Sequence, residues 1–179
     1  MRFSRAHLSL ALLAGLVCLS GLTWSPLVAQ SASFSVFGTS CAPGPLRPGP
    51  HSRIRSTGLP VIGTSFSIDY DGLSSILFGQ EWRPVLLFGF ASANVPFDGI
   101  TPLQPPGCSL QIQPVGAILM PSAGRDWQRF MIFPIPVDHR LLGQSFLAQW
   151  VLLGNTCASS GCTLEFLLAS NVGRATIGF

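Results

Sequence analysis

Few residues in this chain have the chemistry of a catalytic base. Among its three histidines, only His51 and His139 lie beyond an apolar N-terminal leader. A serine or cysteine nucleophile needs such a base and a group that orients it. Both histidines lie in segments predicted to be solvated loops, and the chain contains no Gly-x-Ser-x-Gly elbow. We therefore predict that the protein is not an enzyme and uses no cofactor.

The seven carboxylates offer another route to catalysis, because a pair of them can hydrolyse a glycosidic bond. Their positions along the chain do not indicate such a pair. The run Asp69-Tyr70-Asp71-Gly72 has oxygen ligands suited to calcium, but the remaining ligands of a calcium loop do not follow it. A turn that closes a strand is the simpler interpretation. The sequence thus predicts no metal site.

Aromatic side chains near predicted strand ends are the best candidates for ligand binding. An exposed ring can stack on the apolar face of a sugar, and Trp82, Trp127 and Tyr70 lie at such positions. The thirteen phenylalanines indicate that aromatic rings mainly fill the core, and Trp150 lies inside an apolar run. Core packing is the favoured role for these rings. Ligand stacking by Trp82, Trp127 and Tyr70 is the alternative.

The basic residues are all arginines, and three of them gather in one segment. Arg47, Arg53 and Arg55 lie with His51 in a stretch without acidic residues. Such a segment can contact an anionic polysaccharide or a phosphate surface, although a solvated proline-rich arm is the simpler interpretation. Without the leader, eight basic and seven acidic residues leave a net charge near +1. This balance argues against a nucleic-acid partner.

The N-terminus has the pattern of a secretory signal peptide. Arg2 and Arg5 precede an apolar run of about 15 residues, and small residues follow near Ala29. The run is shorter than the roughly 20 residues of a membrane-spanning helix, so we expect cleavage and no transmembrane anchor afterwards. Cleavage after Ala29 or after Ser31 fits the pattern. We predict a signal peptide at 1–29, or to 31, and a single domain at 30–179 that is secreted, periplasmic or in the cell envelope.

Four cysteines remain after the leader, which removes Cys18. They are Cys41, Cys108, Cys157 and Cys162, and they allow three pairings that arithmetic alone does not separate. Because Cys157 and Cys162 flank a short loop between two apolar runs, we favour that pair together with Cys41–Cys108. A zinc site is disfavoured, because paired C-x-x-C knuckles are absent and export favours oxidation.

Strands rather than helices are predicted throughout the mature chain, because fifteen prolines and nineteen glycines interrupt every helical pattern. Period-two alternation predicts a half-buried strand that carries Phe66, Ile68 and Tyr70. The apolar run 84–91 predicts a strand buried on both faces, and 144–153 is the strongest strand candidate. Further strands are predicted at 33–37, 108–113, 127–132, 163–168 and 175–179, whereas 41–55 is a loop or an extended edge.

These strands and turns predict an all-β fold. We expect a disulfide-stapled β-sandwich of jelly-roll-like type, with a small β-barrel as the alternative.

An ordered series of motifs spans nearly the whole mature chain. The motifs are Phe37-Gly-Thr-Ser-Cys41, Leu59-Pro-Val-Ile-Gly-Thr-Ser-Phe66, Pro106-Gly-Cys-Ser-Leu110, Pro134-Ile-Pro136, Leu141-Leu-Gly-Gln-Ser-Phe-Leu-Ala-Gln-Trp150 and Arg174-Ala-Thr-Ile-Gly178. Together they resemble an uncharacterised family of small secreted bacterial all-β domains. The resemblance implies a Cys41–Cys108 pair. The chain departs from the family in Ser170-Asn171-Val172-Gly173, where a valine is inserted into the family's usual Ser-Asn-Gly turn. It implies no catalytic residues.

The function predicted from these observations is that of a secreted, non-catalytic structural or adhesive module of the cell envelope or the extracellular space. Extracellular polysaccharide or envelope proteins are the partners that suit this role. The alternative is a carbohydrate-binding module that uses exposed aromatic rings.

Overall fold

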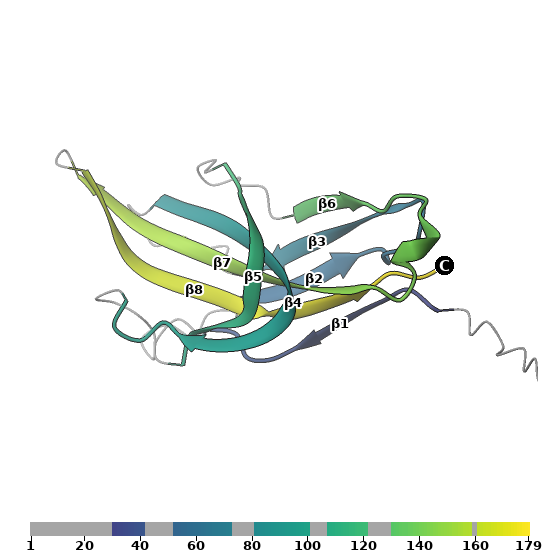
Figure 1. Ribbon diagram of the computed structural model, residues 1–179. Helices are drawn as coiled ribbons and strands as arrows, with labels where there is room; N and C mark the ends of the chain where they lie inside the picture. Colours follow the sequence, from purple (N-terminus) through teal and green to yellow (C-terminus); the bar gives the residue numbers. More distant parts are fainter. Residues whose placement is uncertain (1–29, 42–51, 73–80, 101–106, 122–129, 159–160) are drawn as a thin grey trace, which may run out of the picture.

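The computed structural model describes residues 30–41, 52–72, 81–100, 107–121, 130–158 and 161–179 (Figure 1). Their regular structure consists of eight strands and one 3-10 turn, η2 (His139–Leu141). The strands form two antiparallel sheets, which confirms the predicted all-β sandwich. Within the described ranges, no helix combines the length and the apolar character needed to span a membrane.

The larger sheet contains five strands. In spatial order they are β1 (Ser33–Phe37), β8 (Gly161–Thr176), β7 (Ser145–Ala158), β4 (Glu81–Pro96) and β5 (Ser109–Leu119). The strands β7 and β8 form a long hairpin whose ladder runs from Ser145↔Thr176 to Ala158↔Gly161. Strand β8 includes the whole strand predicted at 163–168 and the first two residues of the one predicted at 175–179. The two predictions merge into one strand because β7 pairs with β8 from end to end.

The smaller sheet contains three strands. In spatial order they are β2 (Arg53–Thr57), β3 (Ser65–Asp71) and β6 (Phe130–Pro134). In the central strand β3, Phe66, Ile68 and Tyr70 are buried, which confirms the predicted period-two pattern. Strand β2 is an edge strand and comes from the end of the segment predicted as a loop or an extended edge.

The main core lies between the two sheets. Alternate side chains of β7, including Ala148, Trp150 and Leu152, pack with the buried face of β3. The Trp150 side chain is fully buried, and Tyr70 meets it edge-on with ring centroids 6.3 Å apart. Burial of each such large side chain contributes about 1.5–3 kcal/mol.

The opposite face of the larger sheet carries a second, smaller core. Ile112 of β5, Leu147 of β7 and Val172 of β8 are buried together there. Strand β5 crosses over the other strands in Figure 1, and this curl covers the second core. The five-stranded sheet therefore buries parts of both faces, although the smaller sheet covers only one of them.

Strand β4 provides this curvature through irregularities in its ladder with β5. The register shifts around Gly89 and again between Ser92 and Val95, and such bulges bend a strand. The prediction that 84–91 is buried on both faces is wrong at its C-terminal end. Leu86 is fully buried, but the Phe90 side chain is 73% exposed, because the strand bends away from the core there.

Candidate functional site

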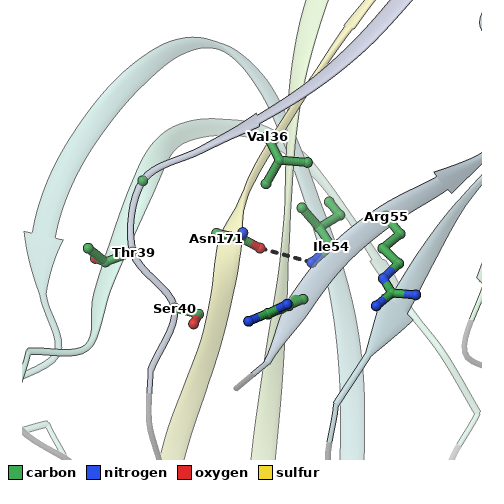
Figure 2. A pocket seen from close by; sticks show the side chains of 8 residues that line it. Val36, Thr39, Ser40, Ile54, Arg55 and Asn171 are labelled. Atoms are coloured by element: carbon green, nitrogen blue, oxygen red, sulfur yellow. Dashed lines mark hydrogen bonds between the residues drawn. The ribbon is translucent and has the colours of Figure 1, made fainter. Parts of the chain in front are cut away.

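An open groove lies where the edge strands of the two sheets approach each other, between β1, β2 and β8 (Figure 2). Its volume is about 510 Å³. The residues that line it are Val36, Gly38, Thr39, Ser40, Arg53, Ile54, Arg55 and Asn171. Neither an acidic side chain nor a histidine belongs to this set of described residues.

A β-bulge in β8 places Asn171 in the groove. Gln149 pairs with Val172 and Val151 pairs with Ala169, so that Trp150 faces two residues of β8 instead of one. The Trp150 backbone N–H donates to the Ser170 Oγ at 3.0 Å. This bond replaces the backbone hydrogen bond that the Trp150 N–H would make in a regular ladder. Residues 170–173, where the inserted valine left the local turn open, therefore form a bulge within a continuous strand.

The Asn171 side chain joins the two sheets. Its Oδ1 accepts a hydrogen bond from the Ile54 backbone N–H at 2.9 Å, as the dashed line in Figure 2 shows. Because β2 is an edge strand, this N–H would otherwise have no strand partner on that side. The same contact fixes the distance between β2 and β8 at the floor of the groove.

The two arginines of β2 project from its exposed face. Arg53 and Arg55 are two residues apart and therefore point to the same side of the strand. Arg55 Nη2 lies 2.5 Å from Asp71 Oδ2. Both side chains are about half exposed or more, so this pair contributes no more than about 1 kcal/mol to stability. Its main effect is to hold the Arg55 side chain in one orientation.

Asp69 is the other carboxylate on this face, and two hydroxyl groups donate hydrogen bonds to it. Its Oδ2 accepts a hydrogen bond from the Thr57 Oγ1 and its Oδ1 accepts one from the Ser67 Oγ, each at 2.6 Å. Asp71 in turn binds Arg55. Among the described residues, Arg53 consequently has no ion-pair partner, although Asp71 lies directly opposite it in the ladder.

The rim formed by residues 38–40 is held in place by β5. Gly38 has a φ of 76°, a conformation that favours glycine, and a side chain there would overlap the Gln111 carboxamide. The Gln111 Oε1 accepts a hydrogen bond from the Thr39 N–H at 3.1 Å, and its Nε2 donates to the Thr39 carbonyl. The rim is therefore attached to the far edge of the same five-stranded sheet.

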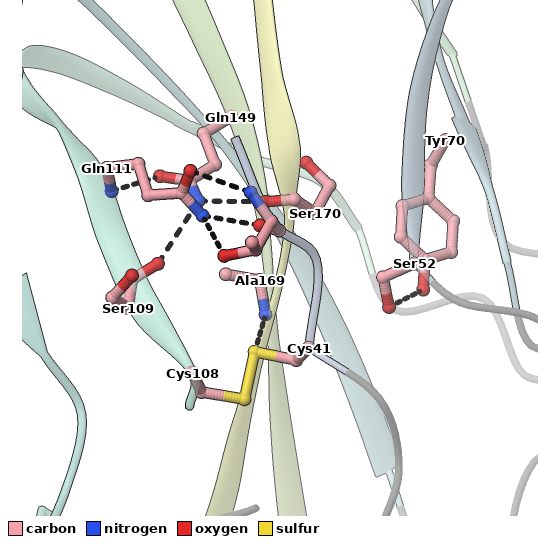
Figure 3. Close-up of a disulfide and its surroundings, with 10 residues drawn as sticks. Cys41, Ser52, Tyr70, Cys108, Ser109, Gln111, Gln149, Ala169 and Ser170 are labelled. Carbon is pink, nitrogen blue, oxygen red and sulfur yellow. Dashed lines mark hydrogen bonds between the residues drawn. A yellow bond between two sulfur atoms is a disulfide. The ribbon is translucent and has the colours of Figure 1, made fainter. Parts of the chain in front are cut away.

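The disulfide Cys41–Cys108 makes the same connection covalently, from the segment after β1 to the start of β5 (Figure 3). The predicted pairing is confirmed, with a Cα–Cα distance of 4.9 Å. Cys41 also bonds β8, because its N–H donates to the Ala169 carbonyl at 2.9 Å. Structural disulfides persist in oxidising compartments, so this bond indicates that the protein folds in one.

A buried glutamine completes the connection between strands β5, β7 and β8 (Figure 3). The Gln149 Oε1 accepts a hydrogen bond from the Gln111 N–H at 2.9 Å. Its Nε2 donates to the carbonyls of Ser170 at 2.8 Å and Ser109 at 3.2 Å. Because Gln149 is fully buried, this polar group is tolerated only while its bonds remain intact.

Of the three aromatic residues that the sequence nominates for ligand stacking, only Tyr70 has a described side chain. Tyr70 is 3% exposed, and its hydroxyl lies 2.8 Å from the Ser52 Oγ in the interior (Figure 3). Its ring is therefore enclosed by the core and cannot stack on a ligand. Trp82 lies in β4 opposite Gly154, but its side chain is outside the described part, as is all of Trp127.

The remaining candidate residues do not form a cluster in the described part of the chain. His139 lies in η2, with its ring centroid 6.1 Å from that of Phe179, while His51 lies outside the described residues. No group of three potential metal ligands occurs among the residues that were described. Cys157 and Cys162 are directly opposite in the β7–β8 ladder, although their side chains lie outside the description.

No protein-family model, curated protein or solved structure matches the chain.

The sequence indicated Arg53 and Arg55 as part of a cationic segment with Arg47 and His51, but it gave no indication of Asn171 or Thr39. The signal for Asn171 was present only as a polar pair, Ser170-Asn171, inside an apolar stretch. Its partner Ile54 is 117 positions away in the sequence, so no local pattern could indicate the contact.

Proposed function

We propose that the protein is an extracytoplasmic, non-catalytic module with an adhesive or structural role in the cell envelope or its surroundings. The observation that carries the proposal is the groove between β1, β2 and β8, whose lining combines arginines, hydroxyl groups and a carboxamide. Such a surface can hold a ligand by hydrogen bonds and charge. General acid–base chemistry would need a titratable group near neutral pH in the same place, and the lining contains none.

The way in which polar residues are used supports the same role. Gln149, Gln111 and Asn171 connect strands that lie far apart in the sequence, and the Cys41–Cys108 bond does so covalently. These connections make the groove a rigid surface. Rigid surfaces suit adhesion, because little conformational entropy is lost when a ligand binds. The motif series that resembles secreted bacterial domains is consistent with the proposal.

Fractionation of cells that express the full chain tests this function. We expect a processed protein that begins near residue 30 or 32, lies outside the cytoplasm, lacks free thiols and sediments with isolated envelope material. Leu12→Arg, which interrupts the apolar leader, is the control for export and should leave the chain in the cytoplasm. A cytoplasmic, reduced wild-type protein would contradict the proposal, as would turnover of ester or glycoside substrates.

A second candidate function, carbohydrate binding through aromatic rings, is favoured by one observation. The Phe90 ring is 73% exposed on β4, the strand that also carries Trp82. Exposed rings of this kind can stack on neutral sugars. Binding to a neutral glycan that Phe90→Ala or Trp82→Ala abolishes would favour this candidate over the groove.

A further inference from the structure

The groove offers many hydrogen-bond donors and little negative charge. Arg53 has five N–H donors and no ion-pair partner among the described residues, because Asp71 binds Arg55 and hydroxyl groups occupy Asp69. The two carboxylates nearest to Arg53 in the ladder, Asp69 and Asp71, are thus bound to other side chains. A ligand that carries an oxyanion would meet a guanidinium whose charge is not already neutralised by a neighbour.

Two further sets of donors face the same space. Asn171 uses its Oδ1 to bind the Ile54 N–H, which orients the carboxamide and leaves its NH₂ group without a partner in the described chain. Ser40 contributes a hydroxyl from the opposite rim, and its side chain lines the groove together with that of Asn171 (Figure 2). The guanidinium, amide and hydroxyl donors therefore surround one volume.

The chemistry of these groups selects the ligand. A guanidinium binds carboxylate or sulfate oxygens in a bidentate manner, and the amide and hydroxyl donors suit the remaining oxygens of a sugar. Val36, which is 45% exposed, adds a small apolar surface for the C–H face of a ring. No aromatic ring lines the groove, so the stacking platform that single-stranded nucleic acids require is missing from this set of residues.

We propose that the groove between β1, β2 and β8 binds an acidic polysaccharide, with Arg53 bound to a carboxylate or sulfate group and Asn171 and Ser40 bound to neighbouring oxygens. This inference rests on the proposed adhesive function and gives it a ligand class.

Binding to three soluble polymers tests the inference: polygalacturonate, which carries carboxylates, heparin, which adds sulfates, and neutral dextran. Calorimetry with the secreted protein should show binding to at least one acidic polymer and none to dextran. Arg53→Gln should weaken that binding about tenfold, the effect of losing a charge-assisted contact. Binding to heparin without binding to polygalacturonate would identify a sulfate as the group that Arg53 recognises.

Arg140→Gln is the matched control, because Arg140 is also an exposed arginine but lies in η2, away from the groove and next to Asp138. An equal loss in both variants would overturn the inference, since bulk charge would then explain binding. Binding to neither acidic polymer would also overturn it. If Arg53→Gln binds both polymers like the wild type but still sediments with envelope material, the groove is excluded as the site while the adhesive function stands.

Discussion

Asn171 in β8 accepts a hydrogen bond from the Ile54 N–H in β2 at 2.9 Å, and this bond links the two sheets. The bulge opposite Trp150 turns Asn171 toward β2. An irregularity in the larger sheet thus supplies a hydrogen-bond acceptor to the smaller sheet. The same bond caps an edge strand that could otherwise pair with another chain.

Asn171→Ala removes the partner of a part-buried N–H. We expect a loss of about 1–3 kcal/mol in the free energy of unfolding, the usual cost of leaving such a donor unpaired. Urea denaturation followed by fluorescence measures it. Asn171→Asp is the control, because it keeps an acceptor oxygen and should lose less. Equal losses in both variants would show that the bond to Ile54 is not the stabilising interaction.

Removal of the Cys41–Cys108 disulfide should cost more. The bond closes a loop with a sequence separation of 67, for which the chain-entropy model gives about 4 kcal/mol. The double variant Cys41→Ser with Cys108→Ser should therefore unfold at a much lower urea concentration. A shift in stability below about 1 kcal/mol would mean that Gln111 and Gln149 hold the sheet edges together without the covalent bond.

Gln149→Leu replaces the buried carboxamide by an apolar group of similar length. It leaves the Gln111 N–H and the Ser170 carbonyl without their partner, at a cost of about 1–3 kcal/mol for each unpaired group. Denaturant midpoints compare this variant with Gln113→Leu, an exposed control on β5. Comparable midpoints for the two variants would contradict a structural role for the Gln149 network.

Gly89→Ala tests how closely β4 and β5 approach at the bulge. A Cβ at Gly89 would lie 2.1 Å from the Gln113 carbonyl oxygen, a backbone atom that cannot rotate away. We expect destabilisation at the upper end of the range of about 1–3 kcal/mol for overpacking. Thermal unfolding measures it, with Ser92→Ala on the exposed part of β4 as the control. An unchanged melting temperature would place the two strands further apart.

Cys157 and Cys162 should form the second disulfide. Directly opposite residues in an antiparallel pair have Cα atoms about 4.5–5.5 Å apart, and this lies within the span of about 4.4–6.8 Å for a disulfide. Mass spectrometry of the unreduced, digested protein should find this cross-link and no free thiol. Alkylation of both residues in a sample that retains Cys41–Cys108 would contradict the pairing.

The sequence by itself determined the secondary structure of the central elements. Period-two alternation identified the buried face of β3, and the prolines and glycines excluded regular helices, because both signals act over a few neighbouring residues. The same local signals predicted that β6 ends at its prolines and that β7 is a strong strand. The hairpin loop also placed Cys157 opposite Cys162, since the register of a hairpin follows from its turn.

Tertiary structure alone decided the site. Tyr70 lies in the core because β3 faces Trp150 across the sandwich, a relation between segments 80 residues apart in the sequence. Arg53 is left without an ion-pair partner among the described residues because Asp71 binds Arg55 and not the arginine directly opposite it. The register shift between β7 and β8 that places Asn171 in the groove likewise depends on how whole strands pair. Such long-range packing leaves no pattern in the neighbouring sequence, so the groove emerged only from the folded chain.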